Sequence, residues 1–207
     1  MTNTRFFRFT TLRTIPRHTV NLTIFLTITS VLCLLLQQPL LSDWTEWHRQ
    51  AINHGEWWRI LSGNFTHTNY PHLLMNLAGL WVIAHLFKPN GKTFALLLVM
   101  ISFMVGLANL LTSMQIYVGL SGTLHGLFAY FALRESLEGR KSSWLLVLGV
   151  VLKVAWEHWM GASASTSELI GARVAIEAHL AGMSSGFLLA SLPPLYQRYL
   201  NAKDKAS

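Results

Sequence analysis

The stretch VGLSGTLHG, residues 118–126, places a serine and a histidine between glycines within an otherwise apolar part of the chain. In a soluble protein it would read as an ordinary glycine-rich turn. Inside a bilayer, polar and ionisable groups are costly, and those that occur there usually have a functional role. The interpretation of Ser121 and His125 therefore depends on whether the surrounding chain spans a membrane.

The composition favours a membrane protein with several spans. Of the 207 residues, 52% are hydrophobic and only 12% are charged, and the chain has 8 Trp and 11 Phe. Soluble domains carry about 25% charged residues. The single cysteine, Cys33, excludes an internal disulfide and lies in an apolar run.

Six apolar runs are expected to form the spanning helices, and the sequence SLPPLY, residues 191–196, is expected to end the last of them. The first run follows a basic segment without a small-residue cleavage site, so it is interpreted as an uncleaved helix. The tryptophan-rich segment 43–65 is too polar to span and suits the membrane interface. The predicted fold is an all-α bundle of six transmembrane helices, with residues 1–19 as a cytoplasmic segment, 20–196 as the domain and 197–207 as a cytoplasmic tail. The runs are 20–36, 72–87, 94–111, 121–133, 144–159 and 175–195.

The net charge of +7 is explained by its distribution along the chain. With the N-terminus inside the cell, basic residues gather in the inner segments, which is the positive-inside pattern. Both termini are then cytoplasmic, in the inner (plasma) membrane, and a nucleic-acid partner has little support. The outer segments carry Arg49, Arg59 and Arg173, whereas the inner ones carry Arg5, Arg8, Arg13, Arg17, Lys88, Lys92, Arg134, Arg140, Lys141, Arg198, Lys203 and Lys205.

The same map gives the depth of Ser121. It precedes the inner residue Arg134 by 13 positions, which is about 20 Å of helix in a hydrocarbon core about 30 Å thick. A helix starting at Ser121 is thus too short to span alone. Residues 114–122 should enter the protein as irregular backbone lining a cavity.

Three further polar side chains are predicted at similar depth. Asn76, His179 and His72 lie about 18, 21 and 24 Å above the inner ends of their helices. Ser121 and His179 are the minimum pair for nucleophilic acyl chemistry, with the histidine as base. His72 and Asn76 share one helix face and suit an oxyanion site, to which the Ser121 amide would add a third donor.

Glycines are placed to bring these groups together. Gly119 and Gly122 flank the serine and permit tight backbone geometry and close approach of a substrate. Gly182 and Gly186 follow His179 on one helix face. They are predicted to let that helix press against the helix that starts at Ser121.

At these residues the sequence resembles the rhomboid intramembrane serine proteases. The similar motifs are EWWRILSGNFTH (56–67), THTNYPHLLMN (66–76), GLSG (119–122) and AHLAGMSSG (178–186). The resemblance implies a Ser121–His179 catalytic dyad, with His72 and Asn76 at the oxyanion. It also implies transmembrane protein substrates within the lipid bilayer, and no cofactor or metal.

A finer resemblance concerns His125 in GLSGTLHG and the run LKVAWEHW (152–159), which are similar to the rhombosortase branch. Rhombosortases are associated with substrates that end in a Gly-Gly motif, a transmembrane helix and a basic tail. The alternatives are a general rhomboid protease with other substrates and an inactive relative that binds transmembrane helices. A small transporter or proton channel is a third alternative.

Several residues have less specific interpretations. His125, one turn from Ser121, is expected either to contact the catalytic residues without touching substrate or to have a structural role. Lys153 and Glu157, one turn apart, form either a pair that fixes the fifth helix or a substrate-facing group. His67 could join His72 and His125 around zinc, but no HExxH motif or cysteine partner accompanies them.

Overall fold

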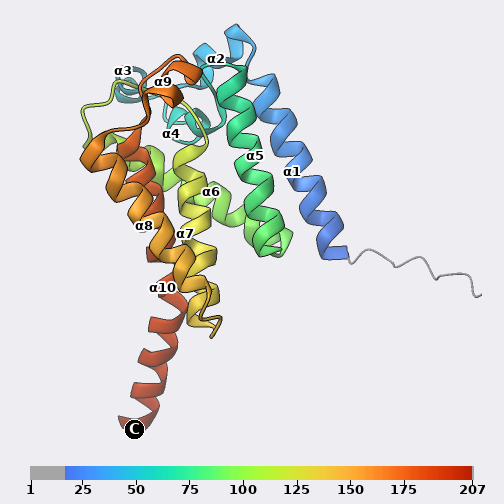
Figure 1. Cartoon of the computed structure of the whole chain (residues 1–207), viewed down its shortest axis with the longest axis vertical. Helices are drawn as coiled ribbons and strands as arrows, with labels where there is room; N and C mark the ends of the chain where they lie inside the picture. The colour runs from blue at the N-terminus through green and yellow to red at the C-terminus, as the bar shows by residue number, and fades with distance from the viewer. Residues whose placement is uncertain (1–16, 207) are drawn as a thin grey trace, which may run out of the picture.

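A computed structural model describes residues 17–206 of the chain, and side chains from 21 to 192. The predicted basic residues Arg5, Arg8 and Arg13 lie outside this range. The described part is a helical bundle (Figure 1), and each predicted apolar run lies largely within one long helix. These helices are α1 (Arg17–Leu35), α5 (Tyr70–Phe87), α6 (Gly91–Ala108), α7 (Ser121–Leu137), α8 (Ser143–Met160) and α10 (Ile176–Ala206).

Short elements gather at one end of the bundle, the upper end in Figure 1. The tryptophan-rich segment 43–65 forms much of this end, as short helices and loops. Its strand β1 (Trp47–His48) pairs antiparallel with β2 (Ile116–Tyr117), with Trp47 opposite Tyr117. The pairing joins this segment to the chain just before Ser121. The remaining short elements are α2 (Pro39–Thr45), α3 (Arg49–Asn53), α4 (Arg59–Ser62), η1 (Gly63–Phe65), η2 (Asn109–Leu111) and α9 (Ala164–Ile170).

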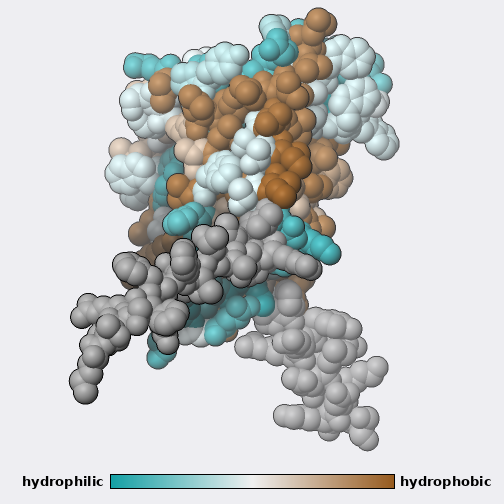
Figure 2. Space-filling view, turned by 90° about the vertical axis from the view of Figure 1, so that its right-hand side faces the viewer, coloured by the Kyte–Doolittle hydropathy of each residue, from teal (hydrophilic) through white to brown (hydrophobic). Residues whose placement is uncertain are grey.

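Two described helical stretches, Tyr70–Phe87 and Gly91–Leu111, are long and apolar enough to cross a membrane. Two bent pairs qualify only when each is taken as one span: Asn21–Leu35 with Pro39–Thr45, and Ser143–Met160 with Ala164–Ile170. Length and composition thus support two to four spans among the described residues, and the count of six stays a prediction. One reason is α7, which has 17 residues and carries polar side chains. The surface over α1 shows a broad apolar area (Figure 2), consistent with an integral membrane protein.

The end of α10 differs from the expectation. SLPPLY was expected to stop the helix, but α10 continues through Pro193 and Pro194 to Ala206. Each proline removes only its own N–H donor and disturbs one preceding carbonyl. Membrane proteins tolerate such prolines where neighbouring groups compensate. The predicted boundary of the tail at residue 197 is therefore not a break in the helix.

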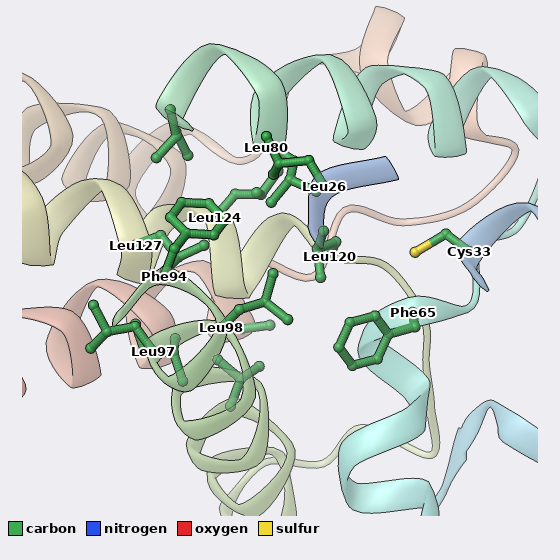
Figure 3. Close-up of a cluster of buried hydrophobic side chains, with 14 of the residues drawn as sticks. Leu26, Cys33, Phe65, Leu80, Phe94, Leu97, Leu98, Leu120, Leu124 and Leu127 are labelled. Atoms are coloured by element: carbon green, nitrogen blue, oxygen red, sulfur yellow. The ribbon is translucent and has the colours of Figure 1, made fainter. Parts of the chain in front are cut away.

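The core lies between α1, α5, α6 and α7 (Figure 3). Leu26 of α1, Leu80 of α5 and Leu98 of α6 are buried there with Leu124 and Leu127 of α7. Lipid tails are as apolar as these side chains, so close packing rather than exclusion from water holds such helices together. The core fixes α5 beside α7, and these two helices carry most of the predicted site.

Candidate active site

The backbone before α7 presents Ser121 as the first residue of that helix. Gly119 has a φ of +119°, which strongly favours glycine. The Tyr117 hydroxyl donates to the Gly119 carbonyl at 2.6 Å, and the Gly119 amide donates to the carbonyl of Gly63 at 3.1 Å. The segment 114–122, predicted as irregular backbone, is irregular only in part, because Ile116–Tyr117 form strand β2 and α7 already begins at Ser121.

Close packing of α10 along α7 brings His179 to Ser121 (Figure 1). The Nε2 atom of His179 lies 2.9 Å from the Ser121 Oγ. A Cβ on Gly182 would overlap the Gly122 carbonyl oxygen, and one on Gly186 would overlap that of Gly126. The predicted role of these glycines in helix contact is confirmed.

A cavity of about 740 Å³ opens over the pair. His72 and Asn76 of α5 line it together with Ser121 and His179, as do His125, Lys153 and Glu157. The predicted site residues with functional side chains thus share one cavity, although they come from four helices. Gly122 instead packs against α10, where a Cβ would lie 2.8 Å from the Ala178 carbonyl oxygen.

Polar groups of the two predicted oxyanion residues, His72 and Asn76, lie near Gly119. The Asn76 Nδ2 atom is buried without a hydrogen-bond partner. A Cβ on Gly119 would lie 2.7 Å from the His72 Nε2 atom and 3.7 Å from this Nδ2. The glycine therefore leaves both groups accessible, in addition to allowing the positive φ.

His125 lies one turn below Ser121 and stacks on His179. The two rings are 4.1 Å apart at an interplanar angle of 18°. The His125 Nδ1 atom donates to the Ser121 carbonyl oxygen at 2.7 Å. His125 thus covers one face of the His179 ring while contacting the backbone of the serine.

Glu157 of α8 contacts both Lys153 and His179. The predicted pair is present, with the Lys153 Nζ atom 2.5 Å from one Glu157 oxygen. The other oxygen lies 2.9 Å from the His179 Nδ1 atom. The contact with His179 was not predicted, because the relative rotation of α8 and α10 is not readable from spacing.

Two residues absent from the sequence prediction tie α5 to α9. The Thr68 hydroxyl donates to the Ile170 carbonyl at 2.6 Å and lies 3.1 Å from the His72 Nδ1 atom. Asn69 accepts the His72 amide at 2.9 Å as the N-cap of α5 and donates to the Leu169 carbonyl at 3.0 Å. The Asn-Tyr-Pro sequence before His72 was the available signal, since Asn is a favoured N-cap and Pro a favoured first-turn residue.

A third residue absent from the site prediction, Arg49, binds the chain that leads to β2. Its guanidinium donates to the carbonyls of Asn109, Leu110, Thr112 and Met114 at 2.7 to 3.1 Å. A basic residue within a tryptophan-rich segment was the only sequence signal. The contact links the segment 43–65 to the loop before the nucleophile.

Potential metal ligands gather in a different set from the one considered in the sequence. Among the described residues, ligand atoms of His125, Glu157 and His179 lie within 4.8 Å of one another. Two of these residues, Glu157 and His179, are already hydrogen-bonded to each other. His67 is not in this group: its ring contacts that of His72 at 5.1 Å, and both its nitrogens are buried without a partner.

The fold and cavity indicate an integral membrane protein of packed helices with a serine–histidine pair that lines a cavity. Residues 54–193 match the family model of the Rhomboid domain, and this range includes every residue that lines the cavity. The chain belongs to the rhomboid family, whose members are generally intramembrane serine proteases acting on transmembrane substrates. A search of curated proteins found no match. The predicted family is thereby confirmed.

Proposed function

We propose that this chain is an active intramembrane serine protease with Ser121 as nucleophile and His179 as general base. The observation that carries this proposal is the 2.9 Å contact between the His179 Nε2 and Ser121 Oγ atoms in a cavity. An inactive relative that only binds transmembrane helices would not need a base in contact with a serine. The Lys153–Glu157 pair, which a transporter would use, instead contacts this base.

The reaction follows from this pair. His179 takes the Ser121 hydroxyl proton as the Oγ atom attacks the scissile carbonyl, and the C–O bond forms as the carbonyl π electrons move to oxygen. His179 then gives the proton to the leaving nitrogen, and the C–N bond breaks to leave an acyl-enzyme. Water, deprotonated by His179, releases the acyl group and restores the serine.

The developing oxyanion requires donors fixed in advance. Asn76 supplies its unpartnered Nδ2 group. His72 supplies Nε2–H when its Nδ1 accepts the Thr68 amide, 3.5 Å away. The Ser121 amide, at the start of α7, is one of the N–H groups that a helix cannot pair internally.

The same proposal includes the membrane arrangement. The protease domain is residues 20–196, with six spans in the inner (plasma) membrane and both termini cytoplasmic. The distribution of basic residues supports this orientation. A periplasmic reporter fused after Ser207 should be inactive, and an active one would overturn the orientation.

For the substrate we propose a single-span protein with a Gly-Gly pair outside its transmembrane helix and a basic tail, cleaved near the outer face. A helical peptide bond must unwind to reach Ser121, and each glycine weakens a helix by about 1 kcal/mol relative to alanine. Glycine also presents no side chain to the cavity. The basic tail would remain inside by the charge rule that orients the protease.

Labelling with a fluorophosphonate probe tests the activity. The purified chain should be labelled at Ser121, and Ser121→Ala and His179→Ala should abolish labelling. Ser136→Ala is the matched control, because Ser136 lies on the same helix and donates only to the Ala132 carbonyl. Failure of the folded wild-type chain to label would favour the inactive relative.

A further inference from the structure

We infer that Glu157 completes a Ser121–His179–Glu157 triad, in which it is a positioning residue that acts through His179. The inference rests on the proposed function and adds a residue to it. It concerns a carboxylate on a third helix, α8, that reaches the imidazole on the side opposite the serine.

The three groups form one continuous chain of contacts. Glu157 Oε2 lies 2.9 Å from His179 Nδ1, and His179 Nε2 lies 2.9 Å from Ser121 Oγ. The side chains of His179 and Glu157 are 5% and 12% exposed, so water competes little for these bonds. Both imidazole nitrogens are therefore committed, one to each neighbour.

This arrangement selects the tautomer that catalysis needs. An ionised carboxylate can only accept hydrogen bonds, so the contact with Glu157 requires a proton on Nδ1 of His179. The Nε2 atom of a neutral imidazole then holds a lone pair that points at the Ser121 hydroxyl. That is the form able to remove the serine proton.

The carboxylate also stabilises the charge that forms during the reaction. When His179 takes the proton it becomes an imidazolium beside Glu157, and a low local dielectric strengthens that attraction. Lys153 holds the other carboxylate oxygen at 2.5 Å. The lysine thus orients Glu157 and balances its negative charge in the resting state.

The His179 ring is held from a third direction by His125. Its stacking on His179 restricts rotation of the ring out of the triad plane. The His125 Nδ1 proton is directed to the Ser121 carbonyl and not to Glu157. Glu157 is left with two partners, Lys153 and His179.

The simpler alternative is that Glu157 serves only as the partner of Lys153 and fixes α8. Two variants separate the roles. Lys153→Met removes the ion pair but leaves the contact between Glu157 and His179. Glu157→Gln removes the carboxylate charge from both contacts, the one with Lys153 and the one with His179. An ion-pair role predicts equal losses, and a triad predicts a much larger loss for Glu157→Gln.

The first test compares rates of fluorophosphonate labelling at Ser121 in detergent micelles. Glu157→Gln should slow labelling by about 100-fold or more, because loss of the carboxylate from a serine-protease triad costs about 10⁴-fold. Glu157→Asp should recover part of the rate, and Lys153→Met should lose less than about 10-fold.

The second test uses proton NMR of the folded chain and does not depend on activity. A His179 Nδ1 proton shared with a carboxylate should give a far-downfield resonance that disappears in His179→Ala and in Glu157→Gln but persists in Lys153→Met. Absence of this resonance in the wild-type chain would overturn the triad. So would labelling of Glu157→Gln within about twofold of wild type, which would leave the serine protease intact. A wild-type chain that shows the resonance but is not labelled would overturn the proposed function instead.

Discussion

Gly182 of α10 lies directly against the carbonyl oxygen of Gly122 of α7, so closely that a Cβ at position 182 would overlap that oxygen. This contact is one turn from His179 and two residues from the loop that presents Ser121. The separation of the two helices, and with it the distance between base and nucleophile, therefore depends on the absence of a single methyl group.

Gly182→Ala should consequently damage both stability and activity. Overpacking of a closely packed contact costs about 1–3 kcal/mol, and a shift of about 1 Å in a catalytic pair can cost 100-fold in rate. Thermal unfolding in micelles and labelling of Ser121 measure the two effects. Gly149→Ala is the matched control, because Gly149 is also helical but faces open space; it should be neutral or slightly stabilising.

His72→Ala and Asn76→Ala should lower kcat for a transmembrane substrate by about 100- to 1000-fold with little change in KM. Their contacts strengthen only as charge develops on the substrate oxygen. Leu74→Ala, on the same helix but exposed, should retain wild-type turnover. Near-normal kcat in both site variants would show that neither residue stabilises the oxyanion.

Gly119→Ala should abolish cleavage for two separable reasons. The substitution strains a backbone with a φ of +119°, and its Cβ would lie 2.7 Å from the His72 Nε2 atom. Gly139→Ala carries a similar strain, at φ +103°, but meets no atom within 4 Å. If both variants lost stability equally while only Gly119→Ala lost turnover, the loss would be due to the crowded oxyanion site; equal turnover would contradict this.

His67 should make the folded chain sensitive to acid. Burial, and secondarily the nearby His72, lowers the pKa of His67 to about 3 from its ordinary value of 6.5. Below about pH 6.5 the unfolded chain takes up a proton that the folded chain does not, so stability is complete above that pH and declines as the pH falls, by at most about 1.4 kcal/mol per pH unit.

Thermal unfolding between pH 7.5 and 4.5 measures this effect. His67→Phe should flatten the decline in Tm, because the ring no longer titrates. His54→Phe, at an exposed position, should keep the wild-type slope. A His67→Phe slope identical to wild type would mean that another group causes the acid sensitivity.

Processing of a substrate with a Gly-Gly pair should depend on both glycines. Changing them to valine should block release of its outer domain, because valine weakens a helix less than glycine does and brings bulky, rigid side chains to the cavity. Immunoblots of the anchored form, with mass spectrometry of the new C-terminus, follow the reaction. Unchanged processing would remove the glycine preference and leave a rhomboid protease of other specificity.

The sequence predicted which polar side chains meet in the cavity, whereas the number of spans stays a prediction. Ser121, His72, Asn76 and His179 could be grouped because their distances from charged helix ends place them at one depth, and the helix contact followed from glycine spacing. Depth says nothing about helix rotation, so the contact between Glu157 and His179 could not be foreseen. The continuation of α10 past Pro193 was missed because proline weakens a helix locally without always ending it.

The four carbonyls bound by Arg49 have a further consequence for the chain before the nucleophile. Backbone groups in such a loop ordinarily depend on water, which is scarce beside a bilayer. A guanidinium carries five N–H donors in a rigid plane, whereas an ammonium has three on a flexible stem. Arg49 thus supplies hydrogen-bond donors that water would otherwise provide, and it holds four carbonyls of an irregular loop in one arrangement.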